Sequence, residues 1–359
     1  MKNHFKYTII GAGVIGLAVA ERLSRKYDNI LVIEKEKKFG LHTSSRNSEV
    51  IHSGFYYPQN SLKAKLCVQG NDMIYHFCNK YNIPYKKCGK LVVANSTSAM
   101  SKLDTILLRA IENGVKDIRV LSKKEALDIE SNVRSEKSLW IPSAGIMDSH
   151  LIMSKLENLS LSRDVSIIYN LELESIKKNK DLYNINFIND NTCITTEYVI
   201  NCGGLWAHHI ANKLLNKKYE IEYYKGDYFK TSQVRNLNCL IYPVPKDISL
   251  GIHAILNLNG EVFFGPNVYK IDAIDYRTTD KYKTQFIREA NQLMLSNITD
   301  LHSDFSGIRP KIRYDNKMND FIITEEYGFN NFYNLIGIDS PGLTSSLAIA
   351  DFVYKLIKD

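Results

Sequence analysis

The start of the chain alternates between apolar runs and one glycine-rich stretch. Residues 6–10 form an apolar run typical of a buried strand, and residues 14–26 carry apolar side chains at helical spacing. Residues 30–33 form a second apolar run. The order strand, turn, helix and strand predicts a βαβ unit here.

Later segments follow two different patterns. Strand–turn–helix units recur at 197–215 and 332–357, whereas residues 221–265 alternate as antiparallel strands do, with turns such as Asn259-Gly260. We therefore predict a mixed α/β (α+β) fold, in which a substrate domain with a mostly antiparallel sheet is inserted into a Rossmann-like nucleotide-binding domain. The expected segments are 1–84, 146–220 and 306–359 for the nucleotide-binding domain, and 85–145 and 221–305 for the substrate domain.

Composition narrows the class of protein. A length of 359 residues suits two domains, and an apolar fraction of 44% is ordinary for a chain that buries a core. The net charge of +7 comes without a long basic run, so we expect a solvated surface and no nucleic-acid partner. The six cysteines form no C-x-x-C pair and no zinc-like spacing, which favours a reducing compartment and no metal. We expect a cytoplasmic protein and leave open peripheral contact with the inner face of a membrane.

The glycine-rich stretch has the spacing of a dinucleotide-binding loop. Gly11 permits a tight turn, Gly13 lets the backbone approach a pyrophosphate, and Gly16 lets the helix pack against the strand. The N–H groups at the start of the helix then face the phosphates. Glu34 ends the second strand, where a carboxylate can accept both ribose hydroxyls. The loop residues expected at the cofactor are Gly11, Gly13, Val14, Ile15 and Gly16.

Two later segments favour FAD over NAD. A buried strand runs into a turn with Gly203, Gly204 and Trp206, which can pass close to an extended dinucleotide. Near the end of the chain, a loop precedes a helix whose N-terminus can stabilise negative charge on reduced flavin. Each segment is also compatible with an ordinary βα turn. The loop residues expected at FAD are Ser340, Pro341, Gly342, Leu343 and Thr344.

Short segments across nearly the whole chain carry a resemblance to a known group. The chain resembles the D-amino-acid-oxidase-like FAD oxidoreductases, and within them the L-2-hydroxyglutarate dehydrogenase/oxidase family. The matching segments are 11–16 with 34, 47–58, 61–64, 88–91, 145–150, 225–228, 241–245, 251–253, 264–267, 307–311 and 337–344.

The resemblance implies non-covalent FAD and the oxidation of L-2-hydroxyglutarate to 2-oxoglutarate. It also implies an electron acceptor, which is oxygen, a quinone or an electron-transfer flavoprotein. Residues 44–49 depart from the family, because they read Ser-Ser-Arg-Asn-Ser-Glu where Thr-Gly-His-Asn-Ser-Gly is frequent. This change of charge and volume bears on the substrate. Further cofactor contacts are expected at Lys35, Ser44, Ser45, Asn47, Ser48, Gly307 and Arg309.

Oxidation of a 2-hydroxy acid requires a base for the hydroxyl proton, flavin N5 for the hydride and cations for the carboxylates. His52 lies in a polar loop beside Ser53-Gly54 and is the first candidate for the base, because imidazole accepts a proton at neutral pH. His253, on a predicted strand, is its rival. Either imidazole is equally compatible with a packing role.

A cationic series supplies candidate substrate contacts. Arg309, Lys311 and Arg313 project to one face if residues 307–314 are extended, and arginine binds a carboxylate through two N–H groups. Pro310 predicts an edge or a loop, where such a series is commonly solvated. The expected substrate contacts are Arg309, Lys311, Lys225 and Tyr57.

Three functions are compatible with these residues. The first is a flavin dehydrogenase or oxidase of hydroxy acids. The second is an amine or amino-acid oxidase of the sarcosine- or glycine-oxidase type. The third is a non-catalytic FAD-binding or tRNA-modification-type scaffold, which the cationic series and His52 disfavour.

Overall fold

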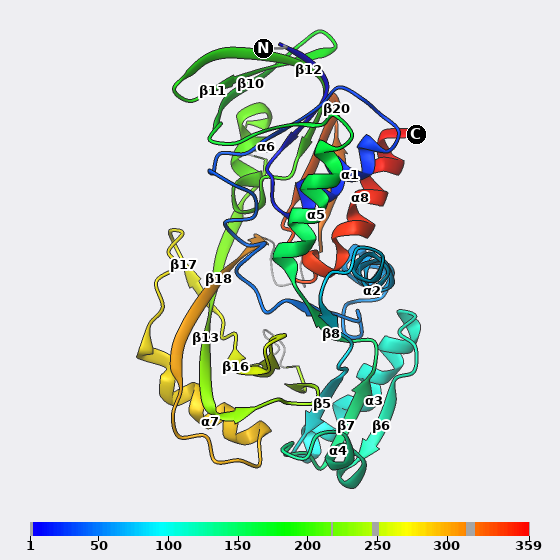
Figure 1. Cartoon of the computed structure of the whole chain (residues 1–359), viewed down its shortest axis with the longest axis vertical. Coiled ribbons are helices and arrows are strands. Elements are labelled where there is room, and N and C mark those ends of the chain that lie inside the picture. Colours follow the sequence, from blue (N-terminus) through cyan, green and yellow to red (C-terminus); the bar gives the residue numbers. More distant parts are fainter. Residues whose placement is uncertain (1–2, 217, 246–250, 314–319, 359) are drawn as a thin grey trace. The chain divides into compact units, whose positions relative to one another are not determined.

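The computed structural model describes residues 3–216, 218–245, 251–313 and 320–358 (Figure 1). The chain separates into two compact units, each assembled from distant segments. The first unit comprises the described residues up to Ser45, Ser149–Tyr223 and those from Arg309 onward. The second comprises Arg46–Asp148 and Tyr224–Ile308.

An eight-stranded sheet forms the centre of the first unit. Its strands run in the order β10-β11-β12-β1-β2-β9, with β20 beside β12 and β19 beside β20. Strands β12, β1, β2 and β9 pair in parallel, while β10 and β11 extend the sheet antiparallel. The strands are β1 His4–Ile10, β2 Ile30–Ile33, β9 Ser166–Ile168, β10 Leu173–Asn179, β11 Leu182–Phe187, β12 Asp190–Asn201, β19 Ile322–Glu326 and β20 Phe329–Ile336.

The helices of the first unit follow the predicted βαβ pattern. Helix α1 (Val14–Ser24) connects β1 to β2, so the predicted strand, turn, helix and strand are confirmed. Helices α1 and α8 lie side by side (Figure 1), and α5 also packs against α1. The other helices of this unit are α5 Ser149–Leu161, α6 Ala207–Leu215 and α8 Gly342–Lys358.

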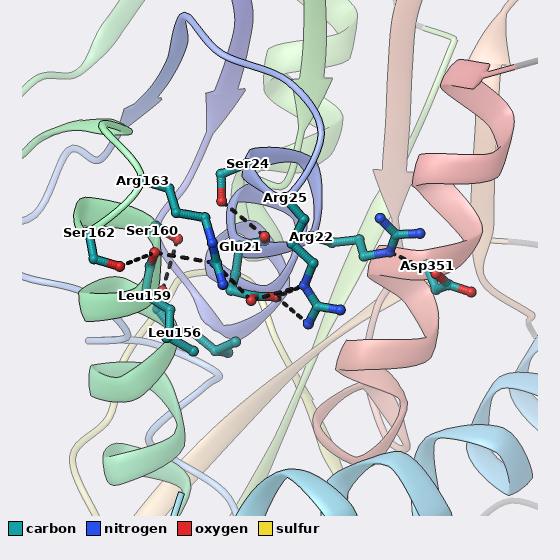
Figure 2. Close-up of polar contacts among 10 residues, drawn as sticks. All are labelled: Glu21, Arg22, Ser24, Arg25, Leu156, Leu159, Ser160, Ser162, Arg163 and Asp351. Carbon is teal, nitrogen blue, oxygen red and sulfur yellow. Dashed lines mark hydrogen bonds and ion pairs between the residues drawn. The ribbon is translucent and has the colours of Figure 1, made fainter. Parts of the chain in front are cut away.

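A buried carboxylate ties α1 to the end of α5. Glu21 is 1% exposed, and it accepts hydrogen bonds from Arg25 Nη2 at 2.8 Å and Arg163 Nη1 at 3.0 Å (Figure 2). On the neighbouring face of α1, Arg22 donates to Asp351 of α8 at 2.8 Å. Both guanidinium groups at Glu21 retain solvent contact, so only the carboxylate needs its partners to offset desolvation.

We expect Glu21→Ala to lower the free energy of unfolding by about 2 kcal/mol, because it leaves two facing guanidinium groups without their shared anion. Urea titration followed by circular dichroism measures this. The matched control is Glu136→Ala, which breaks an exposed ion pair with Lys123. The control should cost less than about 1 kcal/mol. Equal losses in the two variants would contradict a special role for Glu21.

The second unit is built on a nine-stranded sheet of order β17-β13-β16-β15-β14-β5-β7-β6, with β18 beside β13. Strands β5 and β14 pair in parallel. The strand pairs from β14 through β15 and β16 to β13, and those from β5 through β7 to β6, are antiparallel. The predicted mixed fold with a mostly antiparallel second sheet is therefore confirmed. The strands are β5 Lys90–Ala94, β6 Arg119–Ser122, β7 Lys137–Ile141, β13 Ile221–Arg235, β14 Leu240–Pro243, β15 His253–Leu256, β16 Glu261–Gly265, β17 Tyr269–Ile271 and β18 His302–Ile312.

Helices cover both faces of this sheet. Leu103 and Ile106 of α3 belong to one apolar core, and Phe286 and Ala290 of α7 belong to another. A small sheet of β3, β8 and β4 completes the unit. The remaining elements are α2 Leu62–Lys80, α3 Thr97–Glu112, α4 Lys123–Ile129, α7 Lys283–Leu293, β3 Val50–Ile51, β4 Tyr85–Lys86 and β8 Gly145–Met147.

Three predicted boundaries lie within three residues of those of the compact units, and the fourth differs widely. Residues 46–84 were expected in the nucleotide-binding domain, but they lie in the second unit. The reason is pairing over a long sequence distance, since Val50 of β3 pairs with Ile146 of β8. In addition, the Asn71 side chain of α2 donates to the carbonyl of Ser143 at 2.9 Å.

The described residues contain neither a candidate membrane-spanning helix nor a candidate metal site. No helix within them combines the length and apolar character needed to cross a bilayer. In the same part of the chain, no group of three or more His, Cys, Asp or Glu side chains is arranged to hold a metal ion.

Candidate active site

The glycines of the loop between β1 and α1, and Gly16 in the first turn of α1, lie close to neighbouring atoms. A Cβ on Gly11 would lie 2.5 Å from the carbonyl oxygen of Cys202, and one on Gly16 would lie 1.9 Å from that of Gly11. Gly11 also has a φ of +107°, which favours glycine. A Cβ on Gly13 would lie 3.0 Å from Ser44 Oγ. These contacts explain why glycine is required at Gly11 and Gly16, while Gly13 leaves little room for a side chain.

Two predicted cofactor residues bind the backbone of this loop. The carboxylate of Glu34 accepts from the N–H of Ala12 at 2.7 Å, and Ser44 Oγ accepts from the N–H of Val14 at 3.0 Å. Helix α1 has no side-chain cap from Gly13. A helix start that follows a glycine turn and lies beside a carboxylate fits a pyrophosphate followed by a ribose.

An aromatic and charged cluster lies in the same unit. The ammonium of Lys35 is 3.1 Å from the ring centroid of Trp206, a cation–π contact, and the ring of His42 packs edge-on against Trp206 at 4.6 Å. His42 also pairs with Glu36 at 2.8 Å, and this hydrogen bond lowers the pKa of the Glu36 carboxyl. Gly204, two residues before Trp206, has a φ of +54°, and a Cβ there would have no atom within 4 Å.

The C-terminal loop leads into helix α8 at the predicted place. Gly342 is the first residue of α8, and its N–H donates to the Asp339 carbonyl at 2.6 Å. Among the described residues, the buried hydroxyls of Ser345 and Ser346 have no hydrogen-bond partner. Buried orphan hydroxyls at the start of a helix fit a polar ligand, so this end of the first unit is also compatible with FAD.

The second unit contains a cluster of basic side chains. The rings of Tyr242 and His253 stack with centroids 3.6 Å apart and 6° between their planes. The Lys90 ammonium lies 3.8 Å from the Tyr242 centroid, and its side chain is 0% exposed. The charges of Lys90 and His253 both act on His52, so the two predicted base candidates belong to one cluster.

Burial controls protonation in this basic cluster. Desolvation, followed by the charges of Lys90 and His253, places the pKa of His52 well below its usual value. Desolvation also lowers the pKa of Lys90 to about 7. His52 retains some solvent-exposed surface, so a neutral imidazole remains accessible to a proton donor.

Backbone hydrogen bonds fix the loop that carries His52. Asn71 Nδ2 of α2 donates to the His52 carbonyl at 2.9 Å. Asn113 Nδ2 donates to the carbonyls of Gly54 and Tyr57 at 3.0 and 2.9 Å. The polar loop that carries His52 is therefore held by the side-chain amides of Asn71 and Asn113, both of which lie later in the chain.

The residues of the cationic series lie on the more exposed side of their strand, as the alternation predicts. Buried Ile308, Pro310 and Ile312 alternate with partly exposed Arg309 and Lys311, so the segment is extended. Among the described strands β18 pairs with β13 alone, so of the two positions predicted from Pro310, an edge or a loop, the structure has the edge.

The two arginines of this series differ. Arg313 is exposed and pairs with Glu220 at 3.0 Å, so the solvated interpretation holds for Arg313. Arg309 Nη1 is buried and has no hydrogen-bond partner among the described residues, which suits a residue that binds an anion.

Two other predicted substrate residues lie inside the second unit. The ammonium of Lys225 donates to the Arg277 carbonyl at 2.5 Å, and only 4% of Lys225 is exposed. Tyr57 is 1% exposed and packs with Ala64 and Cys67. Both residues therefore have structural contacts that the sequence does not reveal.

The predicted site residues are divided between the two units. The first unit holds Gly11, Gly13, Val14, Ile15, Gly16, Glu34, Lys35, Ser44, Ser45, Gly203, Gly204, Trp206, Arg309, Lys311, Ser340, Pro341, Gly342, Leu343 and Thr344. The second unit holds Asn47, Ser48, His52, Tyr57, Lys225, His253 and Gly307. Sequence reasoning missed Lys90 and Tyr242; the signal for Lys90 was a lysine at the start of an apolar strand.

Comparisons with known proteins agree with this geometry. The model of the family described as FAD dependent oxidoreductase matches residues 6–356. The mitochondrial L-2-hydroxyglutarate dehydrogenase of Arabidopsis thaliana is 35% identical, over 98% of this chain and 83% of that protein. The glycerol 3-phosphate dehydrogenase of Caloramator mitchellensis is 31% identical, over 99% of this chain and 74% of that protein.

A solved structure also resembles the chain over its whole length. The L-alpha-glycerophosphate oxidase of Mycoplasma pneumoniae, with FAD bound, matches with a TM-score of 0.88 and 27% identity, covering 99% of this chain and 95% of that one. The family match extends over nearly all residues and includes the glycine loop and the basic cluster. The chain therefore belongs to the D-amino-acid-oxidase-like family of FAD-dependent oxidoreductases, and it is an enzyme that uses FAD.

Proposed function

We propose that this enzyme oxidises L-2-hydroxyglutarate to 2-oxoglutarate. The observation that carries the proposal is His52, a partly accessible imidazole that burial and neighbouring charge keep unprotonated at neutral pH. The 35% identity to a relative named L-2-hydroxyglutarate dehydrogenase, over nearly the whole chain, supports the same substrate.

The chemistry assigns a separate task to each group. Bound FAD supplies the acceptor, at N5, for the hydride that leaves C2 of the substrate. His52 takes the hydroxyl proton, so that the C–O bond becomes the carbonyl of the 2-oxo acid. Arg309, with its orphaned Nη1, binds a substrate carboxylate. We further propose that the electrons pass to oxygen, a quinone or an electron-transfer flavoprotein.

A second candidate substrate is glycerol 3-phosphate. It is favoured by the 31% identity to a relative named glycerol 3-phosphate dehydrogenase and by the match to an FAD-bound glycerophosphate oxidase. This reaction also removes a hydride and a hydroxyl proton from a secondary alcohol, so His52 would serve equally as its base. The two candidates differ in their anionic groups.

Anaerobic flavin spectra of the purified enzyme separate the candidates. We expect L-2-hydroxyglutarate to bleach the absorbance of oxidised flavin, with much slower bleaching by the D enantiomer, glycerol 3-phosphate, glycine and sarcosine. Bleaching by glycerol 3-phosphate alone would select the second candidate, and bleaching by glycine or sarcosine alone would select an amino-acid oxidase. A flavin that none of these reduces would contradict both hydroxyl substrates.

A further inference from the structure

The segment between β12 and α6 lies directly against the glycine loop of the first unit. The Cys202 N–H donates to the carbonyl of Ile10 at 2.9 Å, and a Cβ on Gly11 would lie 2.5 Å from the Cys202 carbonyl oxygen. A turn of residues 203–207 follows, and it contains Gly204 with open space beside it. The turn is therefore attached to the loop on one side and leaves room for a ligand on another.

One buried side chain binds both ends of this turn. Asn201, the last residue of β12, is 0% exposed. Its Oδ1 accepts from the N–H of Gly203 at 3.2 Å, and its Nδ2 donates to the carbonyl of Ala207 at 2.8 Å. The two ends of the turn need opposite hydrogen-bonding groups, so the shape of the turn depends on which way the Asn201 amide faces.

A buried carboxylate determines that orientation through a second amide. Glu326, at the end of β19, is 3% exposed and accepts from Asn334 Nδ2 at 3.0 Å. Because a carboxylate only accepts, Asn334 presents its NH2 group to Glu326 and its Oδ1 to β12. That Oδ1 accepts from Asn201 Nδ2 at 2.8 Å, so Oδ1 of Asn201 is left for the turn. We call the side chains of Glu326, Asn334 and Asn201 the amide relay.

Two further donors fix the carboxylate of Glu326. Tyr219 Oη donates to Oε2 at 2.8 Å, and the Lys218 ammonium donates to Oε1. The backbone of Tyr219 is itself bound to the Asn212 side chain of α6, at 3.0 and 2.6 Å. Tyr219 and Asn334 bind the same oxygen, whereas Lys218 is exposed. The amide relay therefore depends on Oε2 of Glu326 and not on the ion pair with Lys218.

We propose that Glu326 is a positioning residue for FAD, because its Oε2 orients both amides of the relay and thereby the turn of residues 203–207, which the cofactor contacts. Glu326 is separated from the turn by Asn334 and Asn201, so it acts only through them. The inference takes FAD to lie at the glycine loop, and it holds for any substrate of the enzyme.

The release of FAD from the loaded enzyme measures this effect without a substrate. The enzyme is diluted, and the FAD that passes an ultrafiltration membrane is measured at successive times. We expect Glu326→Leu to release FAD at least roughly tenfold faster than the wild type, because Asn334 loses its acceptor and both amides can turn over. Glu326→Gln should stay within about threefold of the wild-type rate, since glutamine can place its amide oxygen at the Oε2 position. Release from Glu326→Leu at the wild-type rate would overturn the proposal.

A compensating pair of substitutions tests the direction of the relay. Asn334→Asp replaces a donor to Glu326 with a second carboxylate, so at about pH 8 it should release FAD at least roughly tenfold faster. With Glu326→Gln in the same protein, the glutamine can donate to the new carboxylate, whose other oxygen still accepts from Asn201. The double variant should therefore return to within about threefold of the wild-type rate. A double variant as fast as Asn334→Asp alone would overturn the proposal.

A second buried hydrogen bond in the same sheet separates positioning from a general loss of stability. Tyr183→Phe, on β11, removes a bond of 2.7 Å from the tyrosine hydroxyl to the carbonyl of Asn330. Both Tyr183→Phe and Glu326→Leu should melt at a lower temperature than the wild type, because each loses a buried hydrogen bond. Only Glu326→Leu should release FAD faster. Equally fast release from both variants would show that stability alone governs release, and it would overturn the proposal.

Failure of this inference is distinguishable from failure of the proposed function, because FAD release needs no substrate. If L-2-hydroxyglutarate does not reduce the flavin but release still depends on Glu326, the amide relay stands and the proposed reaction falls. If L-2-hydroxyglutarate reduces the flavin and Glu326→Leu releases FAD as the wild type does, the reaction stands and the role of Glu326 falls.

Discussion

His52→Gln is expected to slow flavin reduction by L-2-hydroxyglutarate by about 10²- to 10⁴-fold, the usual contribution of a general base. Glutamine keeps a polar side chain of similar reach but accepts no proton at neutral pH. The reduction rate is measured by anaerobic stopped-flow at saturating substrate. The control is His76→Gln, an exposed change on α2 in the same unit, which should leave the rate unchanged.

The pH dependence of the wild-type rate follows from the same residue. A base works in its neutral form, and the pKa of His52 lies well below its usual value of 6.5. The reduction rate should therefore be constant from pH 8 down to pH 6.5 and decrease only in more acidic solution. A rate that decreases steadily from pH 8 to 6.5 in the wild type, or persists in His52→Gln, would exclude His52 as the base.

Gly16→Ala is expected to yield a protein with little or no flavin. The new Cβ would lie 1.9 Å from the carbonyl oxygen of Gly11, so the start of α1 must move away from the loop that faces the pyrophosphate. We expect the ratio of flavin to protein absorbance to fall at least roughly tenfold, because the close approach of backbone to phosphate is lost. The control Gly328→Asn lies at a φ of +82° in open space, and asparagine adopts such a conformation.

A second variant shows whether Gly16→Ala acts on binding or on folding. Glu34→Gln keeps one side-chain oxygen for the Ala12 N–H and removes the negative charge beside the loop. We expect it to stay folded by circular dichroism and to lose FAD more readily on dialysis than the wild type. Full flavin content in both variants would contradict a dinucleotide at this loop.

Local patterns in the sequence predicted those structural elements whose conformation depends on residues nearby in the sequence. Residues 30–33 are a strand because the run is apolar and short, and Gly11 and Gly16 lie at positions where a side chain would collide with backbone. Pro310 predicted an edge or a loop, and the structure has an extended strand that pairs with β13. The collision at Gly16 is with nearby Gly11, whereas the one at Gly11 is with distant Cys202; the glycine spacing alone predicted both positions.

Features that depend on distant residues were not predictable in this way. The position of residues 46–84 in the second unit follows from pairing between Val50 and Ile146, which no local pattern reveals. Lys225 is a candidate cation by sequence, but its contact with the Arg277 carbonyl becomes visible only in the structure. The contact of the Lys90 ammonium with the ring of Tyr242 joins β5 to β14, two strands far apart in the sequence, so it too becomes visible only in the structure.

The product formed in a single turnover tests the central claim most directly. FAD-loaded enzyme is mixed with L-2-hydroxyglutarate without oxygen, and the acid-quenched solution is assayed for 2-oxoglutarate while the flavin absorbance is recorded. We predict one molecule of 2-oxoglutarate for each flavin reduced. Flavin that stays oxidised, or 2-oxoglutarate that is absent when the flavin is bleached, would contradict the proposed reaction.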